Sequence, residues 1–248
     1  MYTRQFIALC SLFSVIISCE KNSAASADAT ATGKGGSMAR FTIAQNRLYL
    51  ADYSTIEVYD ISANPVVKKN SVYVDFSVET IFPYKDKLFI GSRNGMFIYS
   101  ITDPDKPVKL GEALHVRSCD PVVANDSYSY VTLRSSNSTC GAAQDGLYIY
   151  DVKSILAPKQ LSLLPLESPF GLGLVDTIVF VCRSTYGLTA VNVKDPKNPK
   201  VMYTVKDGNY MDVIPIDQLL ICYVKEGLLL YDISNLQKIV KLGNINYQ

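Results

Sequence analysis

The stretch "GLLLYDISNLQKIVKLG", residues 227–243, decides the fold, because this chain of 248 residues repeats its apolar part five times. In each version a six-residue apolar run is followed by a turn-rich segment and then by another extended run. The five runs are "IEVYDI" (56–61), "MFIYSI" (96–101), "LYIYDV" (147–152), "LTAVNV" (188–193) and "LLLYDI" (228–233). Their starts are separated by 40, 51, 41 and 40 residues. A fixed period of this length indicates a repeat architecture.

Each repeat has room for four short strands. A second apolar run precedes the phrase, as in "KLFIGSR" (87–93) and "QLLICYV" (218–224). The segment after the phrase is rich in Pro, as in "SITDPDKPVKLG" (100–111), and Pro is excluded from central strands. About 40 residues with four short strands is typical of one β-propeller blade. We therefore predict an all-β, five-bladed β-propeller over residues 38–248, with four antiparallel strands per blade.

The blades of a propeller cover one another, and this determines what their middle strands should contain. A sheet covered on both faces has near-continuous apolar strands rather than alternating ones, and "LLICYV" (219–224) fits that pattern. The repeats begin with an inner strand and end with an outer one. Closure of the ring therefore needs no strand shared between the first and last repeats, and packing of the last blade on the first is the alternative.

The repeated phrase resembles the LVIVD-repeat family of bacterial propeller proteins. The resemblance rests on "LLLYDIS" (228–234), "LYIYDV" (147–152) and the downstream "DPxxP" turns. Two further stretches, "GGSMARFTI" (35–43) and "CDPVVANDSYSYVTLR" (119–134), are similar to versions in surface lipoproteins of Bacteroidetes-type bacteria. The molecular role of that family is largely undefined, so the resemblance implies a propeller lipoprotein but no catalytic residues. The fourth repeat, "LTAVNV", departs from the pattern because it lacks the Tyr and the Asp.

The N-terminus has the features of a lipoprotein signal peptide over residues 1–18. Arg4 precedes twelve mostly apolar residues, which are too few to span a bilayer as a helix. "IISC" (16–19) resembles the lipobox of bacterial lipoproteins, which implies cleavage before Cys19 and acylation of its thiol with a fatty acid such as palmitate. The alternatives are an ordinary signal peptide with a chance Cys, or a buried apolar N-terminus.

A polar segment of small residues follows, and we interpret residues 19–37 as the lipidated Cys19 and a flexible tether. Eighteen such residues would span about 25 Å root-mean-square, enough to hold a domain clear of the lipid headgroups. We expect an exported protein that is lipid-anchored to the cell envelope, with the outer membrane as its location.

Charge and composition restrict the partners. Apolar residues make up 48% and charged residues 19%, which is typical of a folded chain. Removal of Arg4 with the signal peptide leaves 23 basic and 23 acidic side chains. A neutral domain has no general electrostatic attraction to nucleic acid or to anionic lipid. We therefore expect no nucleic-acid partner, and membrane contact through the lipid anchor only.

Besides the acylated Cys19, four cysteines remain after removal of the signal peptide. Cys182 and Cys222 occupy equivalent positions in neighbouring repeats, where we expect them to be too far apart to bond and to act as small buried side chains. Cys119 and Cys140 belong to the third repeat, and we predict a disulfide between them that contributes about 3 kcal/mol. A zinc site is the alternative, but the chain has one His and no CxxC motif. We expect no metal and no cofactor.

The residues that open the innermost strands should ring one mouth of the central channel. Counting back from the residue before each phrase gives Arg40, Thr80, Asp120, Leu172 and Asp212, with Glu79, His115, Phe170 and Tyr210 nearby. The insertion at 135–145 should lie on the same face. We select Arg40, Glu79, Asp120, Tyr210 and Asp212 as candidate ligand-binding residues. The alternative is that Arg40 and the carboxylates form a structural ion pair that plugs the channel.

Two classes of function remain. The first is a non-enzymatic binding or scaffolding module for a glycan, peptide or protein. The second is a glycoside-type hydrolase, in which carboxylates at the mouth act as acid and base. The chain contains no GxSxG, HExxH or Cys/His constellation, and this favours binding.

Overall fold

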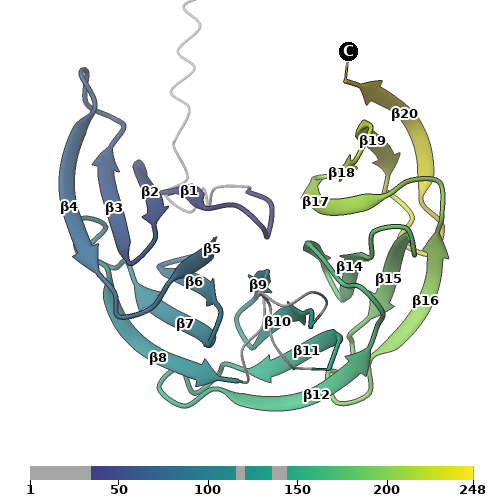
Figure 1. The fold of residues 1–248 in the computed structure, drawn as a ribbon, viewed down its shortest axis with the longest axis horizontal. Coiled ribbons are helices and arrows are strands. Elements are labelled where there is room, and N and C mark those ends of the chain that lie inside the picture. Colours follow the sequence, from purple (N-terminus) through teal and green to yellow (C-terminus); the bar gives the residue numbers. More distant parts are fainter. Residues whose placement is uncertain (1–34, 116–120, 136–143, 248) are drawn as a thin grey trace, which may run out of the picture.

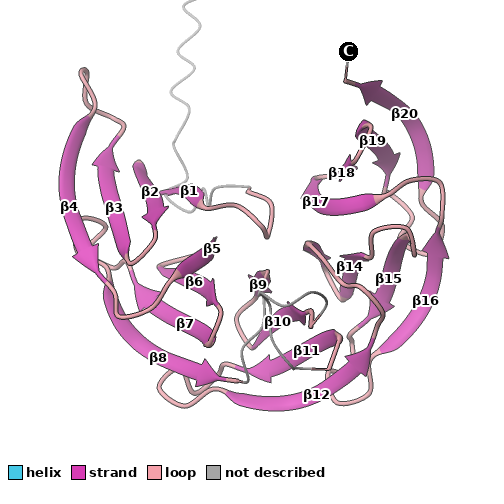
Figure 2. Ribbon diagram, viewed as in Figure 1, coloured by secondary structure: helices cyan, strands magenta, loops and turns pink. Residues whose placement is uncertain are grey.

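The computed structural model describes residues 35–115, 121–135 and 144–247, and it shows a ring of blades around a common centre (Figure 1). Within these ranges every regular element is a β-strand (Figure 2). The twenty strands form five separate sheets of four, and all pairings are antiparallel. Strand order follows chain order from the inner to the outer edge of each sheet. The predicted five-bladed β-propeller is therefore confirmed.

The strands of each blade are as follows. Blade one contains β1 (Phe41–Ala44), β2 (Arg47–Asp52), β3 (Thr55–Asp60) and β4 (Val67–Tyr73). Blade two contains β5 (Val78–Tyr84), β6 (Lys87–Ser92), β7 (Gly95–Ser100) and β8 (Val108–Leu114). Blade three contains β9 (Val122–Ala124), β10 (Tyr128–Leu133), β11 (Gly146–Asp151) and β12 (Lys159–Pro165). Blade four contains β13 (Leu172–Val175), β14 (Ile178–Cys182), β15 (Leu188–Asn192) and β16 (Lys200–Val205). Blade five contains β17 (Tyr210–Ile216), β18 (Leu219–Val224), β19 (Gly227–Asp232) and β20 (Val240–Asn246).

The repeated phrase ends the third strand of every blade in the same way. The pairing register with the outer strand shifts at one position, as between Leu230 and Tyr231 in blade five. The next residue is short and polar, and its side-chain oxygen accepts a hydrogen bond of 2.7 to 3.2 Å from the backbone N–H two residues later. These residues are Asp60, Ser100, Asp151, Asn192 and Asp232. Asn192 makes the same bond as Asp, so blade four keeps the turn despite its departure from the phrase.

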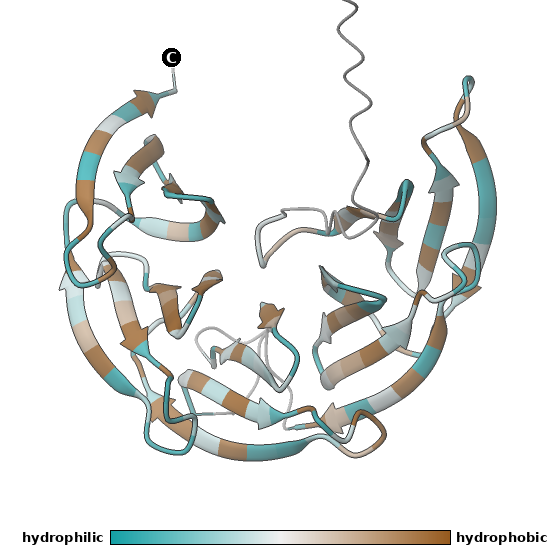
Figure 3. Cartoon of the chain, turned by 180° about the vertical axis from the view of Figure 1, so that it is seen from behind, coloured by the Kyte–Doolittle hydropathy of each residue, from teal (hydrophilic) through white to brown (hydrophobic). Residues whose placement is uncertain are grey.

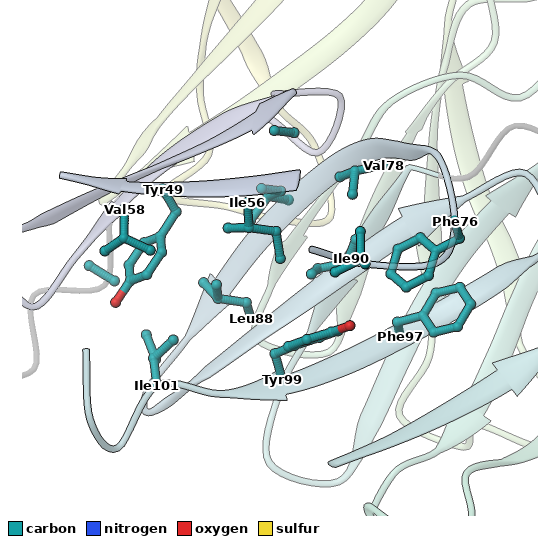
Figure 4. Packing of buried hydrophobic residues seen from close by; sticks show 14 residues of the cluster. Tyr49, Ile56, Val58, Phe76, Val78, Leu88, Ile90, Phe97, Tyr99 and Ile101 are labelled. Carbon is teal, nitrogen blue, oxygen red and sulfur yellow. The ribbon is translucent and has the colours of Figure 1, made fainter. Parts of the chain in front are cut away.

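Four hydrophobic clusters hold the blades together, and each cluster lies between two consecutive blades. In the cluster between blades one and two, Tyr49, Ile56 and Val58 face Leu88, Ile90 and Tyr99 (Figure 4). The rings of Phe76 and Phe97 stack in the same cluster, with centroids 3.7 Å apart. Among the described residues no cluster of this kind joins blade five to blade one.

Burial of the middle strands therefore differs between inner and terminal blades. In β6, β10 and β14 nearly every residue is buried, as predicted for sheets covered on both faces. In β2 and β18 buried residues alternate with more exposed ones, because only one face of each terminal blade is covered. The first and last blades share no strand, and no packing of one on the other closes the ring in the described residues, so the ring is open between them (Figure 1).

The outer strands of the blades have a mixed character. Their residues switch between hydrophilic and hydrophobic along the rim of the ring (Figure 3). Each of these strands carries a lysine in its first half, namely Lys68, Lys109, Lys159, Lys200 and Lys241. Charged side chains on an edge strand oppose pairing with the strands of other molecules.

The two cysteines of the described residues are both buried and unpaired. Cys182 and Cys222 lie in the cluster between blades four and five, which confirms them as small buried side chains. Cys19, Cys119 and Cys140 lie outside the described residues, so acylation and the disulfide between Cys119 and Cys140 stay predictions. In the part of the chain that the structure describes, no helix is long and apolar enough to cross a membrane.

Candidate ligand-binding site

Asp212 was expected at the mouth of the channel, and it is partly buried, with its carboxylate bound to the segment that leads into blade one. Its Oδ1 accepts hydrogen bonds from Ser37 Oγ (3.0 Å) and from the backbone N–H of Val213 (2.9 Å). Its Oδ2 lies 3.4 Å from the backbone N–H of Met38. Ser37 Oγ in turn accepts a 2.7 Å hydrogen bond from the backbone N–H of Leu172. Burial raises the pKa of Asp212, although these donors oppose the rise.

Two glycines make room for this carboxylate. A Cβ atom at Gly36 or at Gly171 would overlap the side chain of Asp212. Ser37 is itself buried at 1% exposure. The last residues of the segment expected as a tether are thus packed against blades four and five. The hydrogen bond from Ser37 to Asp212 therefore joins the segment that leads into blade one to blade five, across the open side of the ring.

The other predicted residues do not assemble around Asp212. Arg40 is exposed, with its guanidinium 5.7 Å from the centre of the Tyr53 ring. Glu79 Oε1 accepts a 2.8 Å hydrogen bond from Arg93 Nε. None of the ion pairs among the described residues joins Arg40 to Asp212, and Asp120 lies outside the described residues. The described members therefore do not form a shared site of charged groups.

Tyr210 belongs to a polar network that is separate from Asp212 and lies within blade five and the segment before it. Its buried hydroxyl donates to the carboxylate of Asp207, and the hydroxyl of Tyr231 contacts the same oxygen at 2.6 Å. Lys241 Nζ donates to the other oxygen at 2.9 Å. Burial alone would raise the pKa of Asp207, but the hydrogen bonds from Tyr210, Tyr231 and Lys241 outweigh it and lower the pKa to about 2. This network is structural, since its groups already satisfy one another.

A cavity of about 350 Å³ occupies the central channel at the other end of the inner strands. Its walls are mostly apolar and are formed by Gly35, Phe82, Pro83, Tyr84, Ala124, Asn125, Leu174, Asp176, Ile214 and Pro215. The amide oxygen of Asn125 accepts hydrogen bonds from the backbone N–H groups of Ser127 and Tyr128. The cavity in the channel is therefore small, and its wall offers few polar groups for a ligand.

A larger groove of about 850 Å³ lies between blades three and four, on the face where Asp212 is anchored. We call it the blade three–four groove. It is lined by Ser135, Gln144, Asp145, Pro165, Leu166, Glu167, Ser168, Arg183 and Tyr186. The insertion expected on this face contributes Ser135, Gln144 and Asp145, and its residues 136–143 lie outside the description. The groove therefore has more room and more polar groups than the channel.

Arg183 is the cation of the groove, and several contacts fix its position. Its Nε donates to the backbone carbonyl of Glu167 at 3.1 Å, and its Nη1 donates to Thr189 Oγ1 at 3.3 Å. Its Nη2 lies 3.9 Å from the carboxylate of Glu167, and the guanidinium lies 5.4 Å from the centre of the Tyr186 ring. Burial lowers the pKa of Arg183, yet an arginine stays charged at neutral pH.

Asp145 stabilises the opposite wall of the groove. Its Oδ1 accepts hydrogen bonds from the backbone N–H (2.7 Å) and the hydroxyl (2.6 Å) of Ser135. Its Oδ2 accepts a 3.2 Å hydrogen bond from the backbone N–H of Ser168. Next to this wall, the guanidinium of Arg134 lies 3.7 Å from the centre of the Phe170 ring. One carboxylate thus joins the loop after β10 to the segment between blades three and four.

Sequence reasoning did not select the residues of this groove. A signal was available, because the second-strand runs of blades two, three and four all end in Arg, at Arg93, Arg134 and Arg183. The described residues contain no group of three His, Cys, Asp or Glu side chains that could hold a metal ion. The chemistry that the groove offers is recognition through a fixed cation, a tyrosine ring and carboxylates.

Comparisons with known proteins find similarity at the level of fold. No protein-family model matches the chain, and no curated protein matches it. A periplasmic gluconolactonase of Pseudomonas aeruginosa is similar in structure, with a TM-score of 0.63 and 12% identity over 82% of this chain and 68% of that one. A Lactobacillus plantarum protein has a TM-score of 0.62 and 12% identity over 81% and 68%.

A functionally unknown protein of Desulfotomaculum acetoxidans has a TM-score of 0.60 and 9% identity, over 79% of this chain and 64% of its own. About a third of each of these three chains lies outside the superposition. At such identities the likeness shows a shared fold and transfers no activity. By its structure, this chain is a β-propeller.

Proposed function

We propose that the protein is a non-enzymatic binding or scaffolding module of the cell envelope, and that the blade three–four groove is its ligand site. The observation that carries this proposal is the position of Arg183, which is held beside Tyr186 in an open groove of about 850 Å³. Loops at one end of a rigid β scaffold carry binding sites more often than the scaffold itself. The groove lies among such loops.

The groove fits a glycan or peptide that carries a carboxylate. A guanidinium pairs with a carboxylate through two parallel hydrogen bonds. The ion pair between Arg183 and the Glu167 carboxylate is long, at 3.9 Å, so a ligand carboxylate could replace it. The 45% exposed ring of Tyr186 offers a face on which a sugar or an aromatic side chain can stack. Glu167 and Asp145 in the lining of the groove are acceptors for hydroxyl or amide groups.

Attachment to the cell envelope is the second part of the proposal. Its support is the sequence, in which an apolar run of signal-peptide length ends in "IISC" (16–19). The repeated phrase supports assignment to the LVIVD-repeat type of propeller. Acylated Cys19 would keep the propeller at a membrane surface, and the equal numbers of acidic and basic residues give it no other attraction to lipid.

A glycoside-type hydrolase has less support. Such an enzyme needs two carboxyl groups that flank a substrate, with one of them able to exchange a proton. Asp212 is enclosed by Gly36, Gly171 and Ser37, and its oxygens accept three hydrogen bonds from the protein. Glu79 is paired with Arg93. Neither carboxylate has the access that the reaction requires.

Titration calorimetry with the full chain tests the ligand site, using uronic-acid oligosaccharides, matched neutral oligosaccharides and acidic peptides as probes. We expect an acidic probe to bind, and Arg183→Ala to weaken that binding at least tenfold. Arg93→Ala is the matched control, because Arg93 directly follows the second strand of blade two, as Arg183 follows that of blade four, and is paired with Glu79 outside the groove. Equal losses in both variants, or no loss in Arg183→Ala, would place the site elsewhere.

A further inference from the structure

Blade five presents an uncovered apolar face to the opening of the ring. The strand registers place Ile214, Ile221, Leu230 and Gly243 in one row across this face. A second row contains Tyr223, Leu228 and Ile245. Tyr223 and Ile245 are 44% and 56% exposed. The opposite face of the same sheet is the one buried against blade four.

Blade one presents a similar face from the other side of the opening. Phe41 lies opposite Leu50, and Ile43 lies opposite Leu48, so these four side chains share one face of the sheet. Phe41, Ile43 and Leu50 are 58%, 45% and 37% exposed. The equivalents of Leu50 in blades two and three, Ile90 and Val131, are completely buried by the preceding blade.

A repeated contact shows what normally covers such a face. In three blades one residue of the outer strand donates a hydrogen bond to a turn carbonyl of the next blade. The bonds run from Asn70 to Asp105 (2.8 Å), from Ser162 to Pro196 (2.6 Å) and from Tyr203 to Leu236 (2.9 Å). At the equivalent position of blade two, Gly111 lies directly against the carbonyl of Ile155.

In blade five the equivalent residue of the outer strand, Gly243, makes no such contact with a following blade. Gly243 pairs with Leu230 as Gly111 pairs with Ile98, yet a Cβ atom at Gly243 would meet nothing within 4 Å. The corresponding turn of blade one, residues 64–66, is exposed. The outer strand of blade five thus has no following blade whose turn it could contact, and the turn of blade one has no preceding outer strand against it.

From these two faces we infer a docking surface: the sector between blades one and five receives a partner polypeptide that supplies a four-stranded antiparallel sheet, one blade in size and apolar on both faces. One such sheet covers both faces and completes both halves of the repeated contact. A second copy of this chain stacked head to tail would cover one face of each molecule and leave the other open, which is a contact that does not close. This surface is separate from the blade three–four groove, so a negative result for one proposal does not bear on the other.

The chain's own inner blade provides a probe for this surface. Residues 166–205, which form blade four with its leading segment, are built to be covered on both faces. We would add a second copy of them after Gln248 of the full chain. The added sheet should raise the melting temperature by at least about 5 °C and reduce the fluorescence of a dye that binds exposed apolar surface.

Two variants keep the test specific. Val179→Asp with Val181→Asp, made in the added copy alone, puts charges on the face that should meet blade five, and it should abolish the gain. Leu230→Asp in blade five should also abolish the gain, while the chain without the added blade should melt within about 2 °C of wild type. An added blade that changes neither melting nor dye binding would overturn the inference.

Sedimentation equilibrium at several protein concentrations tests whether a second copy of the chain fills the sector instead. We expect the five-bladed chain to sediment as a monomer. A dimer that Leu50→Asp dissociates would show that a second copy fills the sector, and it would overturn the proposal of a partner sheet.

Discussion

The hydroxyl groups of Tyr210 and Tyr231 lie 2.5 Å apart and contact the same carboxylate oxygen, Oδ1 of Asp207. Tyr231 is the tyrosine of the repeated phrase, whereas Tyr210 opens the inner strand of the same blade. The carboxylate comes from the segment between blades four and five, so it joins the inner and the third strand of blade five through a residue outside both. This arrangement makes Asp207 a structural residue whose loss can be measured.

Asp207→Ala should lower the free energy of unfolding by about 2 kcal/mol. The substitution removes the acceptor of two buried hydroxyl groups, and an unsatisfied buried donor costs about 1 to 3 kcal/mol. Urea denaturation monitored by tyrosine fluorescence measures the loss. Glu226→Ala is the control, because its side chain lies on the surface next to this network, and it should change stability by less than about 0.5 kcal/mol.

The same carboxylate should make stability depend on pH. Its pKa is about 2 in the folded protein, below the value of about 3.9 in an unfolded chain. A lowered folded-state pKa contributes stability that is fully present above the unfolded value and is lost as the pH falls toward the folded one. Because the side chain is 38% exposed, solvent screening reduces this contribution to about 1 kcal/mol. Wild type and Asp207→Asn should therefore differ by that amount at pH 6. The difference should shrink below about pH 4 and vanish only below about pH 2, where the carboxyl group is protonated in both the folded and the unfolded protein. A difference that does not change with pH would exclude the titration of Asp207 as its cause.

Gly171→Ala should lower the melting temperature by about 5 to 10 °C. A Cβ atom at this position overlaps the carboxylate of Asp212, and overpacking in a core costs about 1 to 3 kcal/mol. The substitution should also loosen Ser37, which limited proteolysis at residues 35–38 would detect. Gly243→Ala is the matched control, since a Cβ atom there meets nothing.

The thiols should divide into two classes. Burial raises the pKa of both Cys182 and Cys222, so neither should react with a thiol reagent at pH 8 until the protein unfolds. Cys119 and Cys140 should be linked, so peptide mass spectrometry of the oxidised protein should find one cross-linked peptide pair. A cross-link between Cys182 and Cys222 would contradict both the structure and the repeat alignment.

Cys19→Ser should abolish lipid attachment. The variant should appear as unprocessed precursor or in the soluble fraction, because one thiol carries the predicted acyl chain and the mature domain has no net charge to hold it at a membrane. Metabolic labelling with a fatty acid, followed by fractionation, provides the measurement. Membrane attachment of wild type without label would disprove the lipoprotein assignment.

The period of the phrase was enough to predict the blades, because strand length, turn chemistry and apolar runs all recur at one spacing. It could not predict the opening, since "LLLYDI" (228–233) is as apolar as the phrases of inner blades although one of its faces is uncovered. Spacing placed Asp212 correctly at the start of an inner strand. Its enclosure depends on Ser37, a residue 175 positions earlier, and no local pattern reports such a contact. Arg183 was missed because a strand-ending arginine does not reveal what lies beside it.

Four clusters that join five blades in a row also determine how the domain should come apart. Loss of blade one or blade five breaks one cluster, whereas loss of blade three breaks two. Apart from the hydrogen bond between Ser37 and Asp212, the molecule therefore has the nearest-neighbour energetics of a linear repeat array. Its two ends are the least protected units, and amide hydrogens in β3 and β19 should exchange with solvent before those in β11.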